Sequence, residues 1–408
     1  MIPVLVLALA AGQPAVPPRP PGLAPELAPP VHLTAGGRPI DVERSGHAAP
    51  CVADLDGDGR LSLLVGQFDG GKLRVYRNAA KAGPPRLEGY DWFAASGGPG
   101  TVPNGCRTSF APAVADLDGD GKVDVVSGSR PGHVYLFRRT ADGFAAPERA
   151  VDADGKDVEV GDETVVAAAD WDGDRKADLI VGNLHGEVFF LRNVGERGRP
   201  AFTAAVRLTA GGAPVAAAGG IAAPCVADWD GDGRLDLVLG AGDGSVVWFR
   251  NEARTGPPRL GPARPLVPPS PAAAWDVAAR GAGGWGERAK PCVFDWDGAG
   301  RPDLLLGDYV GGYEAKPRMT AAEADEERDA LARLPGLRAE WAAAYKDFAA
   351  ALDADPAGPR AADLRRRVTR LREEITRLEA VRARYAVQPM SHGYVWLFRR
   401  LPAEEGKR

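Results

Sequence analysis

Aspartate residues recur in this chain at a spacing that suits a metal ion. The pattern is a nine-residue segment such as Asp116-Leu-Asp-Gly-Asp-Gly-Lys-Val-Asp124, and it occurs five times. Alternation brings positions 1, 3 and 5 to one side of a turn, where their charges repel unless a cation lies between them. Position 7 can add a backbone carbonyl and position 9 a further side-chain oxygen. An all-oxygen shell of this kind favours Ca²⁺ over Mg²⁺.

The five loops supply candidate ligands at positions 1, 3, 5, 7 and 9, where position 7 contributes its carbonyl. Loop one offers Asp54, Asp56, Asp58, Arg60 and Ser62, and loop two offers Asp116, Asp118, Asp120, Lys122 and Asp124. Loop three offers Asp170, Asp172, Asp174, Lys176 and Asp178, and loop four offers Asp228, Asp230, Asp232, Arg234 and Asp236. Loop five offers Asp295, Asp297, Arg301 and Asp303.

The loops differ in completeness. Loops two and four have all four carboxylates and a Gly at position 6, which permits the sharp turn. Loop three has Arg175 at position 6, loop one has the weaker ligand Ser62 at position 9, and loop five has Ala299 at position 5. We therefore expect up to five Ca²⁺ ions, structural rather than catalytic, with loop five the weakest site. The alternative is a metal-free acidic turn held by side-chain-to-backbone hydrogen bonds.

Short apolar segments flank every loop. Around loop four, Pro224-Cys-Val-Ala precedes the aspartates, Leu237-Val-Leu-Gly240 follows them, and Val246-Val-Trp-Phe-Arg-Asn251 comes after the next turn. Short runs of β-branched, aromatic and leucine residues between Gly, Pro and Asp turns predict strands. With a looser fourth segment, each repeat forms one blade of a propeller.

These segments resemble FG-GAP (VCBS-type) repeats, which are also seen in the calcium-bearing propellers of integrin α-subunits. The motif Asp-x-Asp-Gly-Asp-Gly-x-x-Asp with a following Leu-Leu-Val-Gly carries the resemblance. It covers about residues 31–313 and 390–400. The resemblance implies a β-propeller whose calcium loops join the first two strands of a blade. It implies no single activity.

The fifth blade is interrupted and must be completed from elsewhere. After Leu304-Leu-Leu-Gly307 the third strand resumes only at His392-Gly-Tyr-Val-Trp-Leu-Phe-Arg-Arg400. The segment His32–Ile40 looks like the fourth-strand segment Arg207–Val215. We therefore predict an all-β propeller of five four-stranded blades, over 31–313 and 390–401, closed by its N-terminal strand. The alternative is a degenerate extra blade.

Residues 318–388 interrupt the last blade with a different composition, rich in Ala, Arg, Glu and Leu. Apolar residues recur there in two runs at steps of four and three, namely Leu337, Trp341, Tyr345, Phe348 and Leu352, then Leu364, Val368, Leu371, Ile375 and Leu378. Asp355–Pro359 separates two such runs, and Thr320 with Glu323 forms a capping box. The pattern predicts an inserted antiparallel helical hairpin with coiled-coil-like seams, in which Pro335 kinks or shortens the first helix.

The N-terminus indicates export. Residues 1–11 form a short apolar segment with the small-residue site Ala8-Leu-Ala10, typical of a signal peptide, and residues 12–30 form a Pro-rich linker. No other run suits a membrane. We expect a secreted, periplasmic or cell-surface protein. The net charge of −5 belongs largely to the metal loops and is by itself no argument for or against a nucleic-acid partner. No nucleic-acid partner is expected.

Three of the four cysteines occupy one repeat position. Cys51, Cys225 and Cys292 stand where Ala113 and Ala167 stand in the other repeats. A position shared by Cys and Ala favours a small buried residue over a disulfide. Cys106 lies in a loop and has no obvious partner.

The sequence favours a binding or scaffold module for a protein or a carbohydrate. The helical arm would then serve partner docking or oligomerisation, and no catalytic constellation is recognisable. One alternative is a carbohydrate-active lyase or hydrolase whose cleft uses Tyr90, Trp92, Trp285 and Glu287. Another is cell-surface adhesion. Trp92, Trp275 and Trp285 lie in long loops and are the candidates for sugar stacking or a protein contact.

Overall fold

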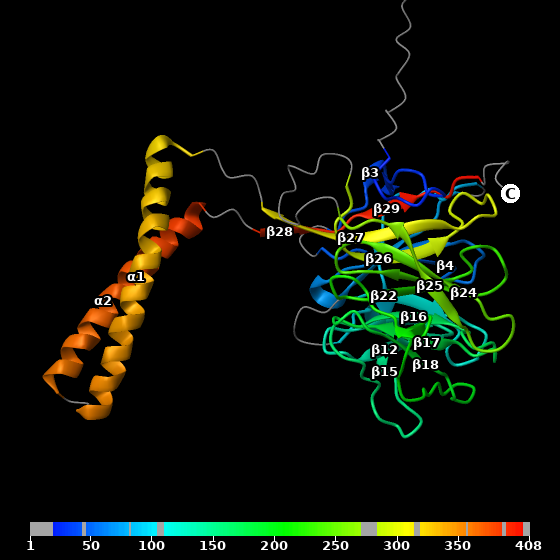
Figure 1. Ribbon diagram of the computed structural model, residues 1–408, viewed down its shortest axis with the longest axis horizontal. Coiled ribbons are helices and arrows are strands. Elements are labelled where there is room, and N and C mark those ends of the chain that lie inside the picture. The colour runs from blue at the N-terminus through cyan, green and yellow to red at the C-terminus, as the bar shows by residue number, and fades with distance from the viewer. Residues whose placement is uncertain are drawn as a thin grey trace, which may run out of the picture. The chain divides into compact units, whose positions relative to one another are not determined.

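The computed structural model consists of two compact units (Figure 1). It describes residues 19–42, 46–80, 83–103, 110–270, 284–313, 319–355, 358–385 and 389–402. One unit comprises residues 1–312 and 391–408, and the other residues 313–390. The predicted signal peptide and most of the predicted linker lie outside the described residues.

The first unit is a propeller of five antiparallel four-stranded blades, which confirms the predicted fold. Blade one holds β4 (Ala49–Ala53), β5 (Ser62–Gly66), β6 (Leu73–Tyr76) and β7 (Asp91–Trp92). Blade two holds β10 (Pro112–Ala115), β11 (Asp124–Gly128), β12 (Val134–Phe137) and β15 (Glu148–Arg149). Blade three holds β16 (Val165–Ala169), β17 (Asp178–Gly182), β18 (Val188–Leu191) and β19 (Val206–Arg207).

Blades four and five complete the ring. Blade four holds β22 (Ala223–Ala227), β23 (Asp236–Gly240), β24 (Val246–Asn251) and β25 (Leu260–Val267). Blade five holds β26 (Glu287–Phe294), β27 (Asp303–Tyr313), β29 (Val395–Phe398) and β1 (Val31–His32). In blade five, β28 (Pro389–His392) also pairs with β27.

Four further hairpins, each made of two antiparallel strands of two residues, accompany the blades in the described part of the chain. They are β2 (Thr34–Ala35) with β3 (Arg38–Pro39), β8 (Ala94–Ala95) with β9 (Gly98–Pro99), β13 (Arg139–Thr140) with β14 (Gly143–Phe144), and β20 (Thr209–Ala210) with β21 (Ala213–Pro214).

The fifth residue of the second strand of each blade is a glycine that sets the distance to the next blade. A Cβ on Gly182 would lie 2.2 Å from the carbonyl oxygen of Ala222 in blade four, so a side chain cannot fit there. Gly307 of blade five would meet the carbonyl of Ala48, which leads into blade one, at 2.1 Å. The Ala48 N–H also donates to the Asp308 carbonyl at 3.0 Å. The same contact therefore joins blade five to blade one and closes the ring.

The N-terminal strand completes blade five as predicted. Val31 pairs with Leu397 and His32 with Trp396 in an antiparallel register. The His32 ring also stacks on the Trp396 indole, with centroids 3.8 Å apart. Pairing the outer edge of blade five removes an exposed strand edge.

Apolar residues at loop position 2 pack between blades. Leu55, Leu117, Trp171, Trp229 and Trp296 are all at most 5% exposed. Burying a large apolar side chain contributes about 1.5–3 kcal/mol to folding, so these side chains anchor the acidic loops to the core. This position therefore serves packing rather than ligand binding.

The second unit is a helical hairpin made of α1 (Ala321–Ala354) and α2 (Pro359–Tyr385). The Thr320 hydroxyl accepts from the Glu323 N–H and the Glu323 carboxylate accepts from the Thr320 N–H, which is the predicted capping box. Helix α1 continues through Pro335, so the prediction that this proline shortens the helix is wrong. None of the described helices is long and apolar enough to cross a bilayer.

The seam of the hairpin differs from the predicted one. Tyr345 is 51% exposed, and the small residues Ala344, Ala351 and Ala361 are buried instead. Nearer the start of α1, the predicted Leu378 is buried in one cluster with Leu334, and the predicted Leu337 and Ile375 pack against that cluster. Arg338 pairs with Glu379 at 2.6 Å across the two helices.

Candidate metal centres and an aromatic pocket

The position-1 aspartate organises each acidic loop. In loop four, Asp228 Oδ1 accepts from the N–H groups of Gly231 and Asp232 at 2.8 and 3.0 Å, and Oδ2 accepts from Gly233 at 2.9 Å. Asp54, Asp116, Asp170 and Asp295 accept equivalent bonds in their own loops. These bonds fold the loop so that the remaining carboxylates converge.

Loop three keeps this geometry despite its arginine at position 6. Arg175 adopts a positive φ of 71°, and its N–H still donates to Asp170 Oδ2 at 2.9 Å. A left-handed conformation costs a non-glycine residue roughly 1–2 kcal/mol. The strain of having arginine at position 6 is therefore carried by the backbone of Arg175 and does not open the loop.

The position-9 aspartate ties each of loops two to five to the backbone at the end of the third strand or one to two residues beyond it. Asp236 is fully buried; its Oδ2 accepts from the Trp229 N–H at 3.2 Å and its Oδ1 from the Asn251 N–H at 2.7 Å. Burial raises the pKa of Asp236, and it raises the pKa values of Asp124 and Asp178 to about 6. A raised pKa means that burial disfavours the charged form of these carboxylates more than their hydrogen bonds favour it, so a nearby positive charge would stabilise them.

Positions 1, 3 and 9 converge in four of the five loops. Each group has ligand oxygens that all lie within 4.8 Å of one another: Asp116, Asp118 and Asp124; Asp170, Asp172 and Asp178; Asp228, Asp230 and Asp236; and Asp295, Asp297 and Asp303. In loop four, Asp230 Oδ1 is buried without a hydrogen-bond partner among the described residues. An orphaned carboxylate oxygen aimed at two others suits a hard cation such as Ca²⁺.

The structure does not bring every predicted ligand into these groups. Loop one has Ser62 at position 9 and forms no such group of three acids among the described residues. Position 5 lies outside all four groups, and where it is an aspartate its carboxylate accepts from the N–H of position 7, as Asp120 does from Lys122 at 2.8 Å. Positions 1, 3 and 9 are therefore the core of each candidate centre.

An arginine at the end of the third strand is a partner that the sequence reading overlooked. Arg250 contacts Asp230 Oδ2 at 2.6 Å and Asp232 Oδ2 at 2.8 Å, and Arg192 contacts the equivalent pair in loop three. Arg77 pairs with Asp56 in loop one. The sequence contains a pattern that could have predicted this contact, because an arginine recurs at this position of every repeat. In loops three and four it neutralises one oxygen each of positions 3 and 5 and leaves the other oxygens for an ion. In loop two the equivalent Arg138 pairs with Glu148 instead.

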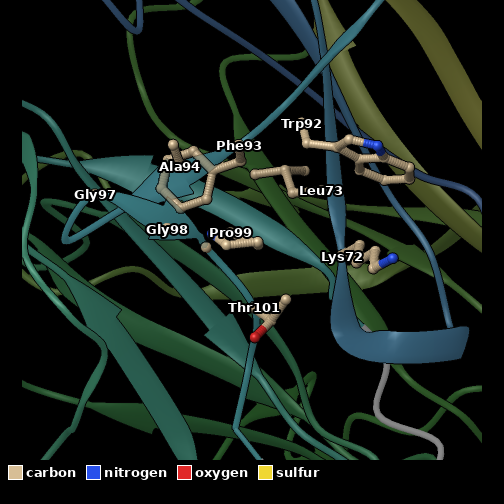
Figure 2. A pocket seen from close by; sticks show the side chains of 10 residues that line it. Lys72, Leu73, Trp92, Phe93, Ala94, Gly97, Gly98, Pro99 and Thr101 are labelled. Atoms are coloured by element: carbon tan, nitrogen blue, oxygen red, sulfur yellow. The ribbon is translucent and has the colours of Figure 1, made fainter.

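A separate pocket of about 360 Å³ lies on blade one (Figure 2). Trp92, Lys72 and Pro99 line it, and Trp92 is 44% exposed. Tyr90, 42% exposed, meets the Trp92 ring edge-on at 5.2 Å. The Lys72 ammonium lies 5.1 Å from the centre of the Trp92 ring. The pocket thus combines exposed aromatic surface with a cationic donor.

Comparison with known families decides the class of the chain. The FG-GAP-like repeat matches three times, over residues 54–127, 116–181 and 170–239. The chain is an FG-GAP-repeat propeller. The matches start at the first aspartates of loops one, two and three. Loop four lies within the third match, and loop five repeats the same pattern beyond the matched residues.

No curated protein matches the FG-GAP propeller. Among solved structures, a lectin from Agrocybe aegerita that recognises non-reducing terminal N-acetylglucosamine is 18% identical, with a TM-score of 0.35. That match covers 65% of this chain and 63% of the lectin, which is under two thirds of its length. A GH43_1 enzyme from Xanthomonas citri, complexed with xylose, is 13% identical with a TM-score of 0.40, over 67% of this chain and 85% of the enzyme.

The structure corrects the predicted sugar cleft of the FG-GAP propeller. Trp285 is only 1% exposed and its indole N–H donates to the Gly244 carbonyl at 3.0 Å, so it is a core residue between blades four and five. Tyr90 and Trp92 lie on blade one, and Glu287 begins β26 of blade five. The four residues therefore do not form one cleft. Trp275 lies outside the described residues.

Three free thiols line the central channel of the FG-GAP propeller. Cys51, Cys225 and Cys292 lie on the innermost strands around a cavity of about 170 Å³. Burial raises the pKa of Cys51 to about 12 and that of Cys225 to about 11, so both stay protonated and unreactive. These three cysteines are unpaired, as expected, but each is half-buried beside the channel rather than fully buried. Cys106 lies outside the described residues.

Proposed function

We propose that this FG-GAP propeller is a calcium-stabilised module that binds carbohydrate in the pocket beside Trp92. The observation that carries the proposal is the pair of exposed aromatic rings, Tyr90 and Trp92, at the edge of that pocket. Large exposed aromatic side chains are costly in water and mark binding surfaces. A sugar ring offers an apolar face for the indole and hydroxyl groups for Lys72.

In this proposal the calcium ions are structural. Each ion would be held by positions 1, 3 and 9 of a loop that joins the first and second strands of a blade. Because position 9 also accepts hydrogen bonds from the third strand, an ion would fasten three strands together. The bound ion would supply the positive charge that the buried carboxylates lack. Export by the signal peptide fits, because calcium is plentiful outside the cytoplasm.

The first test is binding of oligosaccharides to a Trp92→Ala variant. We expect at least a ten-fold loss of affinity for the oligosaccharide that binds best on a glycan array, because the stacking surface is removed. Calorimetry with purified oligosaccharide measures the loss. Val206→Ala is the matched control, since Val206 is 59% exposed on blade three and should bind as the parent does. Equal affinities for the two variants would exclude this pocket as the sugar site.

The enzyme alternative finds no support at this pocket. Glycoside hydrolysis uses a pair of carboxyl groups on either side of the scissile bond. The ten lining residues include no Asp or Glu, and Lys72 is the charged residue among them. The geometry therefore favours binding over hydrolysis there.

The helical hairpin is proposed as a docking or oligomerisation arm. Trp341 and Tyr345 stack on α1 with centroids 5.2 Å apart, and Tyr345 is half exposed. Deleting residues 318–388 tests this role, because β27 and β28 pair and a short turn can join them. We expect the mass in solution, measured by light scattering, to fall to that of a monomer while the melting temperature of the propeller is kept. An unchanged oligomer, or a parent that is already monomeric, would exclude oligomerisation through the arm.

A further inference from the structure

Blade one exchanges the positions of an aromatic and a basic side chain. In blades two, three and five, the third strand carries the aromatic ring and the fourth strand carries the arginine or histidine opposite it, in the pairs Tyr135–Arg149, Phe189–Arg207 and Trp396–His32. In blade one the third strand carries Arg74 and the fourth strand carries Trp92. The exchange places an indole on the outer strand of the blade, where it is 44% exposed.

The basic side chains at β6 lie on the same face of the blade as this indole. Lys72 directly precedes β6 and Arg74 lies within it, and residues two apart in a strand share a face. The Lys72 ammonium lies 5.1 Å and the Arg74 guanidinium carbon 5.7 Å from the centre of the Trp92 ring. Two cationic groups therefore adjoin the exposed aromatic surface.

Arg74 positions the two exposed rings. It is 9% exposed, and its guanidinium donates to Gln67 Oε1 at 3.2 Å and to the Asp41 carbonyl oxygen at 2.7 Å. These bonds hold the guanidinium beside the aromatic pair, 4.8 Å from the centre of the Tyr90 ring. Arg74 is not among the residues that line the pocket, so the ammonium of Lys72 is the cation that a ligand there would meet.

Lys72 lacks the acidic partner that blade two provides at the same place. The residue before the third strand of blade two, His133, bridges to Glu159, and the His133 ring lies 3.2 Å from that carboxylate. The equivalent bridge of blade one joins Lys72 to Thr101, which is uncharged. Lys72 makes no ion pair with any residue that the structure describes. Both side chains of this bridge line the pocket (Figure 2).

Carboxylates of the neighbouring segments contact other basic side chains. Asp91 Oδ2 lies 3.7 Å from Arg77 Nε, and Asp91 points to the other face of β7 because it is adjacent to Trp92. Asp41 Oδ2 lies 2.6 Å from His392 Nδ1. The pocket lining itself contains no Asp or Glu. An anionic group in the pocket would therefore meet the ammonium without a competing acid in the lining.

We propose that the pocket beside Trp92 binds an acidic sugar, whose carboxylate or sulfate group pairs with Lys72 while its ring stacks on the indole. This inference rests on the proposed sugar-binding function and names the class of sugar. An ammonium forms shorter and stronger hydrogen bonds with an anion than with a hydroxyl group. The volume of about 360 Å³ falls in the range of ligand pockets, roughly 300–1,000 Å³.

A glycan array that carries uronate-containing, sulfated and neutral oligosaccharides gives the first test, with the full chain in calcium. We expect the oligosaccharide that binds best to be acidic. A uronate assigns a carboxylate ligand and a sulfated sugar assigns a sulfate ligand. A neutral best binder whose binding requires Trp92 would overturn this inference and leave the sugar pocket standing. Absence of binding by every oligosaccharide would overturn both.

Lys72→Gln is the decisive variant, because it removes the charge and keeps a polar side chain at an exposed position. We expect at least about ten-fold weaker binding of the acidic oligosaccharide by calorimetry. Binding of its neutral derivative, the methyl ester or the desulfated form, should not change. Lys156→Gln is the matched control, since Lys156 is exposed in the loop after β15. Equal affinities of the two variants for the acidic oligosaccharide would overturn the inference.

A second pair of variants restores the acid that blade two carries. Thr101→Glu places a carboxylate opposite Lys72, as Glu159 stands opposite His133, and Thr101→Gln adds a side chain of the same size without the charge. We expect Thr101→Glu to bind the acidic oligosaccharide at least about ten-fold more weakly than Thr101→Gln, and both to bind the neutral derivative equally. Equal binding of the acidic oligosaccharide by these two variants would contradict the pairing with Lys72.

Discussion

Replacing Asp236 by Ala should lower the free energy of unfolding by about 3–5 kcal/mol in calcium. Two buried N–H groups, those of Trp229 and Asn251, would lose their acceptor, at roughly 1–3 kcal/mol each. Loop four would also lose a carboxylate of its candidate metal group. Denaturant unfolding in calcium and in a chelator measures the change. We expect the larger loss in calcium, because the chelated parent gains nothing from the ion.

Two further substitutions separate the roles of Asp236. Asp236→Asn keeps an oxygen acceptor but removes the charge, so it should retain part of the stability in chelator and lose most of the gain from calcium. Ser62→Ala, at position 9 of loop one, should cost less than about 1 kcal/mol. The reason is that loop one forms no group of three converging acids among the described residues, so this substitution removes no carboxylate from a candidate metal centre. If Asp236→Ala loses the same free energy in calcium and in chelator, Asp236 is a hydrogen-bond acceptor and not a metal ligand.

Local patterns predicted most of this fold. The aspartate spacing located the five loops, the alternation of apolar runs and turns gave the blades, and the similarity between residues 32–40 and 207–215 predicted the closing strand. These features depend on residues that are close in sequence or that recur in every repeat. Position 2 of the loop is Leu or Trp in every repeat, and an apolar position shared in this way is typical of packing in the core.

Features that depend on distant residues were not predictable in the same way. Trp285 lies in a long loop, but its indole finds an acceptor in the Gly244 carbonyl, 41 residues earlier, and becomes buried. Glu163 and Arg288 are 125 residues apart and meet only because the ring closes. On the hairpin, a four-three spacing identifies apolar residues without saying which face is packed. Ala344 therefore took the place predicted for Tyr345.

The chelated protein should be more stable at pH 5 than at pH 7.5, and calcium should reverse this order. The reason is the raised pKa of the buried position-9 aspartates, about 6 for Asp124 and Asp178 and also raised for Asp236 and Asp303. A raised pKa in the folded state favours folding below the unfolded pKa of about 3.9. That contribution is lost as the pH rises through about 6.

The expected effect in chelator is large. Between pH 7.5 and pH 5, a folded pKa of about 6 corresponds to about 1.4 kcal/mol for each of Asp124 and Asp178, as an order of magnitude. Asp120 and Asp232 have lowered pKa values and act in the opposite direction, but they lie nearer the solvent, so their effect is smaller. Melting curves at several pH values in chelator measure the balance.

Calcium should invert the dependence because a bound ion requires deprotonated ligands. Its affinity therefore rises with pH, and at a hundred times its dissociation constant each site adds about 2.7 kcal/mol of stability. Bound ions, counted by mass spectrometry under native conditions, should number up to five at pH 7.5 and fewer at pH 5. If the melting temperature shows the same pH dependence in calcium and in chelator, the aspartates do not hold an ion. The buried carboxylates would then be fastened to the third strand by hydrogen bonds alone, and the stability of each blade would rest on its apolar contacts.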